Sequence, residues 1–161
     1  MTNLNHPVEN FELPSTGDKT ISLSDYQGKN IVIYFYPKDS TPGCTIEGQN
    51  FRGAYKQFQQ CNTVILGISR DSIRTHENFK TKQSFPFELL SDKDENACKQ
   101  FDVIKLKKNY GREYMGIERS TFLIDANGNL HEEWRKVKVK GHVEEVLESV
   151  KALYSSQIKD A

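Results

Sequence analysis

Two short apolar runs stand out along the chain. Residues 30–36 are Asn-Ile-Val-Ile-Tyr-Phe-Tyr, and residues 63–69 are Thr-Val-Ile-Leu-Gly-Ile-Ser. Continuous runs of β-branched and aromatic residues, bounded by polar segments, are typical of strands that are buried on both faces of a sheet. We therefore expect these two runs to form the central strands of the protein.

Other segments have the spacing of amphipathic helices. After a turn at residues 37–43, apolar residues recur at intervals near three, four and seven, which places them on one face of a helix. They are Cys44, Phe51, Ala54, Tyr55 and Phe58. Residues 72–82 and 95–101 predict two further helices, and an apolar stripe over residues 143–154 predicts a helix that closes the chain.

Turn residues predict two β-hairpins. Asn127-Gly128 stands between the strand-like residues 121–125 and 130–134, and an Asn-Gly pair in this position is a strong hairpin signal. A smaller hairpin is expected over residues 11–22, around Thr16-Gly17.

The remaining segments complete an α/β pattern. Residues 88–90 predict a short strand, whereas residues 103–118 are polar and contain glycine, so we expect a long loop there. Alternation of strands and helices, followed by a hairpin and a terminal helix, predicts an α/β sandwich. The length suits a single domain over residues 1–161.

Composition narrows the class of protein. Lys and Arg together number 22, as do Asp and Glu, whereas nucleic-acid-binding proteins usually carry a basic surface. Basic runs at residues 105–108 and 135–140 are interpreted as solvated surface. No apolar segment resembles a signal region or the ~20 residues of a membrane helix, and the Cys and His residues lack zinc-ligand spacing. We expect a cytoplasmic monomer without nucleic acid, membrane, metal or cofactor.

Cys44 stands where the first predicted strand gives way to the first helix. The free N–H groups and the dipole at a helix start favour an anion and lower the pKa of a thiol placed there. Pro42 offers no competing N–H, and Gly43 lets a ligand approach the backbone closely. Thr41 adds a hydroxyl that can donate and accept. A lone cysteine is commonly a buried, inert residue, but these neighbours favour a reactive thiolate.

A thiolate that attacks a peroxide needs hydrogen-bond donors at the oxygen that leaves with the developing charge. Thr41 and the N–H groups of Gly43 and Cys44 are candidates, and a permanently charged arginine would serve better. Arg119, at the start of a predicted strand, is the best-placed arginine by topology. Glu47, one helical turn after the cysteine, is expected to orient Arg119 through a bidentate ion pair. The alternatives are a surface salt bridge for the arginine and simple helix stabilisation for the glutamate.

The pattern Pro37-x-x-x-Thr41-x-x-Cys44 resembles the active-site signature of peroxiredoxins, and residues 34–45 resemble their bacterioferritin-comigratory (PrxQ) subfamily in particular. The similarity continues through residues 23–29, 66–69, 90–92 and 115–125. The resemblance implies a thioredoxin-like fold, with a central mixed sheet flanked by helices. It also implies a peroxidase that reduces hydrogen peroxide and organic hydroperoxides, with thioredoxin or another external thiol as reductant. Pro37, Thr41, Cys44 and Arg119 match the family's catalytic positions, where the proline shields the site and the cysteine becomes a sulfenic acid.

The sequence departs from many members of the subfamily in its second cysteine. Where they carry a resolving cysteine five residues after the first, this chain has Gln49. Cys61 lies about 25 Å from Cys44 along one helix, at ~1.5 Å per residue, whereas a disulfide needs Cα atoms within about 7 Å. Cys98, in the predicted helix 95–101, is a possible resolving residue. A one-cysteine cycle is the leading hypothesis, and a Cys44–Cys98 disulfide is the alternative.

Two other functions are open to a cysteine of this kind. A thiol–disulfide oxidoreductase requires Cys-x-x-Cys, but Thr41 and Glu47 occupy those positions around Cys44. A redox-sensing or client-binding protein would use Cys44 as a signal and would not turn over rapidly. A steady-state peroxide assay with a thiol reductant distinguishes this function from a peroxidase.

Overall fold

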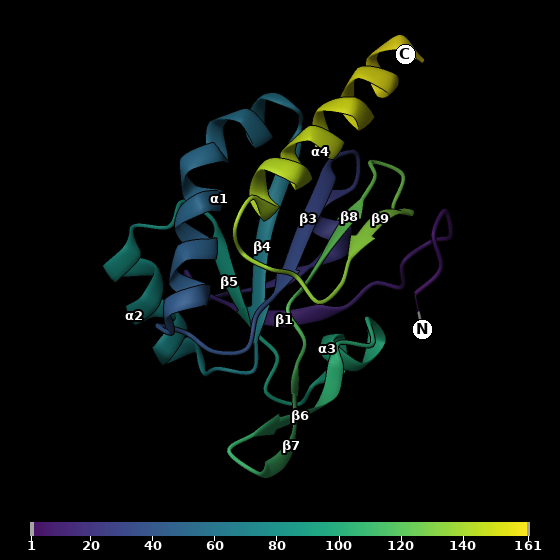
Figure 1. Cartoon of the computed structure of the whole chain (residues 1–161). Coiled ribbons are helices and arrows are strands. Elements are labelled where there is room, and N and C mark those ends of the chain that lie inside the picture. Colours follow the sequence, from purple (N-terminus) through teal and green to yellow (C-terminus); the bar gives the residue numbers. More distant parts are fainter. Residues whose placement is uncertain (1, 161) are drawn as a thin grey trace.

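The computed structural model describes residues 2–160 and is built around a seven-stranded mixed sheet. Its strands are β1 (Glu12–Ser15), β2 (Lys19–Ser22), β3 (Asn30–Phe35), β4 (Thr63–Ser69), β5 (Glu88–Ser91), β8 (Ser120–Ile124) and β9 (Leu130–Trp134). They lie in the order β2-β1-β5-β4-β3-β8-β9 (Figure 1). β3, β4 and β5 are parallel, and the other pairs are antiparallel. Both apolar runs therefore form central strands, as predicted.

Helices cover this sheet. They are the 3-10 turn η1 (Leu23–Tyr26) and the helices α1 (Pro42–Gln60), α2 (Ile73–Gln83), α3 (Asn96–Gln100) and α4 (His142–Lys159). α1 and α4 pack side by side over the sheet (Figure 1). The predicted helices and both predicted hairpins are confirmed. Between residues 2 and 160, no helix combines the length and apolar composition that a membrane crossing requires.

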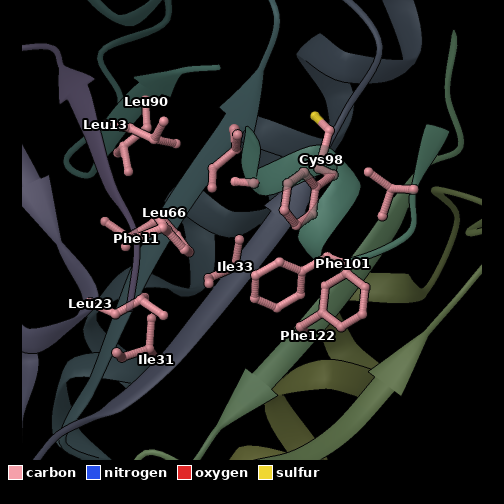
Figure 2. Close-up of a cluster of buried hydrophobic side chains, with 14 of the residues drawn as sticks. Phe11, Leu13, Leu23, Ile31, Ile33, Leu66, Leu90, Cys98, Phe101 and Phe122 are labelled. Carbon is pink, nitrogen blue, oxygen red and sulfur yellow. The ribbon is translucent and has the colours of Figure 1, made fainter. Parts of the chain in front are cut away.

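The core has two halves, one on each face of β3. Alternate side chains of a strand point to opposite faces, and β3 is buried at every position. Ile31, Ile33 and Phe35 belong to the cluster on one face, with residues of β1, α3 and η1 (Figure 2). Val32 and Tyr34 belong to the other cluster, with residues of α1 and α4. The uninterrupted apolar run of β3 follows from this double burial.

The prediction of a long loop at residues 103–118 is wrong. These residues form a separate two-stranded hairpin, β6 (Ile104–Asn109) and β7 (Arg112–Ile117). The connecting residues Tyr110 and Gly111 both have positive φ, which a two-residue type I′ turn requires. Most of the hairpin's side chains are exposed or half-buried. The alternation of buried and exposed residues that identifies a strand in a sequence is therefore missing here.

The sheet brings two distant segments to one edge. β8 is antiparallel to β3, and Ser120 is paired with Phe35. Arg119, just before β8, therefore lies at the end of β3 from which the chain leads to α1. The strand pairing thus brings Arg119 to the segment that contains Cys44, 75 residues away in the chain.

Two glycines of α1 provide a test of this packing. A Cβ at Gly48 would lie 2.3 Å from Cζ of the buried Phe85, whereas a Cβ at Gly53 would meet nothing within 4 Å. We expect Gly48→Ala to lower the free energy of unfolding by about 1–3 kcal/mol through overpacking. Gly53→Ala should raise it by about 0.5–1 kcal/mol, because alanine is the better helix former. Urea denaturation measures both, and equal stability of the two variants would contradict the packing described.

Candidate active site

Cys44 lies in the first turn of α1 and is 2% exposed. Thr41 is the N-cap and Pro42 the first helical residue. The N–H groups of Gly43 and Cys44 belong to the turn that has no carbonyl partners within its own helix. The Thr41 hydroxyl donates to the Lys38 carbonyl at 2.8 Å. Its oxygen therefore keeps lone pairs that can accept a hydrogen bond from a substrate.

The Arg119 guanidinium contacts both Cys44 and Glu47. Its Nη2 donates to Cys44 Sγ at 3.4 Å, and its Nη1 donates to Glu47 Oε1 at 2.6 Å. Gly43 leaves room for this approach, since a Cβ there would lie 3.1 Å from Nη2. The structure thus brings together the cysteine, the arginine and the glutamate that the sequence analysis singled out.

Glu47 is a completely buried carboxyl group. Burial raises its pKa to about 7, although the adjacent Arg119 acts in the opposite direction. Within residues 2–160, its Oε2 has no hydrogen-bond partner, and neither does the buried hydroxyl of Tyr34. Near neutral pH the carboxyl is therefore protonated for part of the time. In that state the positive charge of Arg119 is opposed only weakly by Glu47 and acts more strongly on Cys44.

A buried network that the sequence analysis missed anchors the loop before Cys44. The Asp39 carboxylate accepts a hydrogen bond from the Tyr36 hydroxyl at 2.6 Å and lies 2.6 Å from Nδ1 of His76. The His76 ring is completely buried, and its Nε2 lies 2.9 Å from the Leu90 carbonyl. A carbonyl can only accept, so Nε2 donates to the Leu90 carbonyl, and Nδ1 faces the Asp39 carboxylate. Removing either partner would leave a buried polar group unsatisfied, which is costly.

This network connects the loop to α2 and β5 across 37 residues of sequence. Neither residue has a local pattern that marks it, because a histidine in an amphipathic helix and an aspartate in a turn are both ordinary. Ser40, next in the loop, has a left-handed backbone with φ of 64°. The anchor at Asp39 therefore fixes a turn that is unfavourable for most residues and that leads directly to Thr41.

The other cysteines lie away from this site. Cys98, in α3, is completely buried in the cluster on the opposite face of β3 from Cys44 (Figure 2). Burial and a hydrogen bond with Asp92 raise the pKa of Cys98 far above its ordinary range. Cys61 ends α1 as its C-cap, and burial raises its pKa as well. All three cysteines are free thiols.

Pro37 follows the buried Tyr36 and is half-buried. Its shielding of Cys44 stays a prediction. Within residues 2–160, no group of three or more His, Cys, Asp or Glu side chains is arranged to hold a metal ion.

A cysteine in the first turn of a helix, contacted by an arginine that directly precedes a strand of the mixed sheet, is the arrangement of a thioredoxin-fold thiol enzyme. The family model described as the AhpC/TSA family matches residues 4–133, and the chain belongs to this family of peroxiredoxins. The Peroxiredoxin Bcp of Bacillus subtilis is 55% identical over 88% of this chain and 90% of its own length.

Two solved structures extend this similarity. The bacterioferritin comigratory protein of Xanthomonas campestris is 49% identical, with a TM-score of 0.86 over 89% of this chain and 92% of its own. A PrxQ mutant of Xylella fastidiosa is 47% identical, with a TM-score of 0.90 over 94% and 97%. The predicted thioredoxin-like fold and the predicted subfamily are confirmed.

The raised pKa of Glu47 makes stability depend on pH. Its folded-state value of about 7 lies above the ordinary 4.5, so between these values the folded protein holds a proton that the unfolded chain has released. Glu47 therefore costs stability as the pH rises through this window. We expect Glu47→Gln to become more stable relative to the unmodified protein as the pH rises. The free energy of unfolding of Glu47→Gln, minus that of the unmodified protein, should increase by at most roughly 3 kcal/mol between pH 4.5 and 8.

Urea denaturation of both proteins at several pH values measures this shift. Glu148→Gln is the control, because the side chain of Glu148 is 76% exposed on α4. A difference between Glu47→Gln and the unmodified protein that does not vary with pH would contradict the raised pKa.

Proposed function

We propose that Cys44 is the residue through which this thiol-dependent peroxidase reduces hydrogen peroxide and organic hydroperoxides. The observation that carries the proposal is the 3.4 Å contact between Arg119 Nη2 and Cys44 Sγ. The contact holds the sulfur beside a permanently charged donor, and the thiolate is the nucleophilic form of cysteine. The bacterioferritin comigratory protein of Xanthomonas campestris has alkyl peroxide reduction activity, which supports organic hydroperoxides as substrates here.

The thiolate attacks the terminal oxygen of the hydroperoxide, and the O–O bond breaks as the S–O bond forms. The cysteine becomes a sulfenic acid, and the leaving oxygen takes up a proton to give an alcohol or water. Arg119 and the N–H groups of Gly43 and Cys44 stabilise the negative charge that develops on the leaving oxygen. The Thr41 hydroxyl, which donates to Lys38, accepts a hydrogen bond from the hydroperoxide and orients it.

Glu47 and Asp39 act through other residues. Glu47 holds one side of the Arg119 guanidinium, so that the other side faces the sulfur. Asp39 holds the loop that carries Thr41. Both side chains are buried, which keeps water from loosening the contacts. The arrangement is therefore preorganised before a substrate arrives, and preorganisation is a main source of rate enhancement in such sites.

An external thiol, such as thioredoxin, completes the cycle in this proposal. One thiol attacks the sulfenic acid and releases water, leaving a mixed disulfide. A second thiol then releases Cys44 and carries away the disulfide. Gln49, at the position where many relatives carry a resolving cysteine, donates a hydrogen bond to Gln83. Cys98 is buried on the opposite face of the sheet from Cys44, so a disulfide between them would need a large rearrangement.

We place this activity in the cytoplasm, where thiols stay reduced, since the three cysteines are free. Action as a monomer stays a prediction.

Cys44→Ser tests the proposed nucleophile. The serine hydroxyl is hardly ionised at neutral pH, so peroxide turnover should fall to background, while folding is retained because the side chains are close in size. Cys61→Ser is the matched control and should keep its activity. A steady-state assay with a thiol reductant measures both. Turnover above a few per cent in pure Cys44→Ser protein would overturn the proposal.

The absence of a nearby second thiol gives a prediction about recycling. After one equivalent of peroxide, the Cys44 sulfenic acid should last long enough to react with a dimedone-type reagent, and excess peroxide should oxidise it to the sulfinic acid. Cys98→Ser should turn over normally with a small thiol. Peptide mapping without reduction distinguishes the alternatives. A dominant Cys44–Cys98 peptide, together with loss of turnover in Cys98→Ser, would establish a two-cysteine cycle instead.

A further inference from the structure

The basic run at residues 135–140 lies at the edge of the active site. It belongs to the connection from β9 to α4 (Figure 1). The Val137 N–H donates to the Arg119 carbonyl at 3.0 Å. The position that a Cβ of Gly43 would occupy lies 4.0 Å from Cγ2 of Val139, and this glycine directly precedes the reactive cysteine. The connection therefore forms part of the rim around the reactive sulfur.

Lysines and valines alternate along this connection. Val137 and Val139 are half-buried, whereas Lys136, Lys138 and Lys140 are exposed. The valine side chains thus turn inwards and the lysine side chains turn to solvent. Neighbouring Cα atoms lie about 3.8 Å apart, so two of the lysines flank the valine that approaches the start of α1. The three ammonium groups stand at the rim of the site without lining it.

These three lysines have no direct acidic partner in the part of the chain that the structure describes. Within residues 2–160, none of them has a carboxylate oxygen within 4 Å of its ammonium group. Glu133 is paired with Arg135 instead. Glu118, which lines a cavity with the first of these lysines, and Glu144, in the first turn of α4, also lie beyond this distance. The rim therefore carries local positive charge, although the whole chain has a net charge of zero.

The area that a reductant protein covers includes this part of the rim. A transient redox complex buries less than about 600 Å² on each partner, which corresponds to a circle of about 14 Å radius. Cys44 must lie near the centre of that circle, because a mixed disulfide joins it to the reductant. Ile46, in the same helical turn and 50% exposed, offers an apolar contact there. The lysines on either side of Val139 lie within this area or at its margin.

This combination fits a protein better than a small thiol. Protein interfaces commonly have an apolar centre and a polar or charged rim. The row from Lys136 to Lys140 spans up to about 14 Å of chain. A small thiol with one or two carboxylates can contact one of these lysines, whereas a protein face with several carboxylates can contact them all. Complementary charge also increases the rate of encounter between two proteins.

We propose that Lys136, Lys138 and Lys140 form a docking surface for the protein that reduces oxidised Cys44, and that this protein carries carboxylates around its dithiol. The proposal rests on the peroxidase role of Cys44 and on its recycling by an external thiol. It adds a requirement for the charge of the surface that the reductant presents.

Two synthetic peptides test this requirement. Both contain the same Cys-x-x-Cys dithiol, which is flanked on each side by two glutamates in one peptide and by two glutamines in the other. The protein is first oxidised with one equivalent of hydrogen peroxide. Each peptide then reduces the Cys44 sulfenic acid to the thiol, while its own two sulfurs form a disulfide and the sulfenic oxygen leaves as water. Rapid quenching and mass spectrometry give the second-order rate constant for each peptide.

The quantity compared is the ratio of the two rate constants, acidic peptide over neutral peptide. Any difference in thiol pKa between the peptides cancels, because the same peptides are used with every variant. Lys138→Gln/Lys140→Gln should lower the ratio about fivefold, the size expected for the loss of two exposed charge pairs. Added salt should lower the ratio more in the unmodified protein than in this variant.

Lys29→Gln/Lys159→Gln is the matched control. It removes the same net charge from two exposed lysines that lie away from the site. Lys29 precedes β3 at the end of the strand opposite to the one that leads to Cys44, and Lys159 is the last residue of α4. The control should leave the ratio unchanged. Circular dichroism confirms that both double variants are folded.

An unchanged ratio in Lys138→Gln/Lys140→Gln would overturn the proposal. An equal fall in the control would also overturn it, because the effect would then come from net charge. A third contrary result is an equally large loss of rate for mercaptosuccinate, relative to 2-mercaptoethanol, since the lysines would then bind a small anionic thiol. The peroxidase role of Cys44 is tested separately, by Cys44→Ser with hydrogen peroxide. Oxidation of the lysine variants by hydrogen peroxide should match that of the unmodified protein.

Discussion

The Arg119 guanidinium contacts two groups that are negatively charged when ionised, the Glu47 carboxyl and the Cys44 thiol. The site depends on the balance between these two contacts. Glu47 is buried so completely that its pKa rises to about 7 in spite of the arginine. A carboxyl group exposed to water would be fully ionised at neutral pH and would oppose the positive charge of Arg119. The buried carboxyl of Glu47 is ionised for only part of the time, but its hydrogen bond of 2.6 Å still fixes the position of the guanidinium. Burial of Glu47 thus separates the orientation of Arg119 from the neutralisation of its charge.

Several elements have to be in register for this contact to form. β8 must pair with β3 so that Arg119 reaches the end of the sheet. α1 must begin at Pro42, since a start one turn later would move Cys44 out of the helix. The loop between β3 and α1 is fixed on its other side by Asp39 and His76. The helix start is therefore held between two pairs, one made by Arg119 just before β8 and one made by His76 of α2. Neither pair can shift without leaving a buried polar group without its partner.

The parts of this structure that could be predicted from the sequence are those with a strong local signal. β3 is recognisable because it is apolar at nearly every position, and β8–β9 because Asn127-Gly128 supports a tight turn. The meeting of Cys44 and Arg119 followed from strand order together with family resemblance. The pairing of Asp39 with His76 had no such signal, because it depends on the angle at which α2 packs on the sheet.

The β6–β7 hairpin escaped prediction for a different reason. Its fold rests on its own backbone ladder and on a turn at Tyr110-Gly111, and it has few buried side chains. Hydrophobic patterning detects burial, so a hairpin with little buried surface gives no pattern.

This difference in burial sets the surroundings of Cys44 apart from the hairpin. The groups that surround Cys44 are tied into the core, so most substitutions there would cost stability as well as activity. The hairpin lies outside both halves of the core, apart from Ile117 and the partly buried Ile104 at its base. Exposed residues such as Leu106 and Met115 can change there at little cost to the fold. A hairpin of this kind can change in charge and shape, while Cys44 and Arg119 keep their contact.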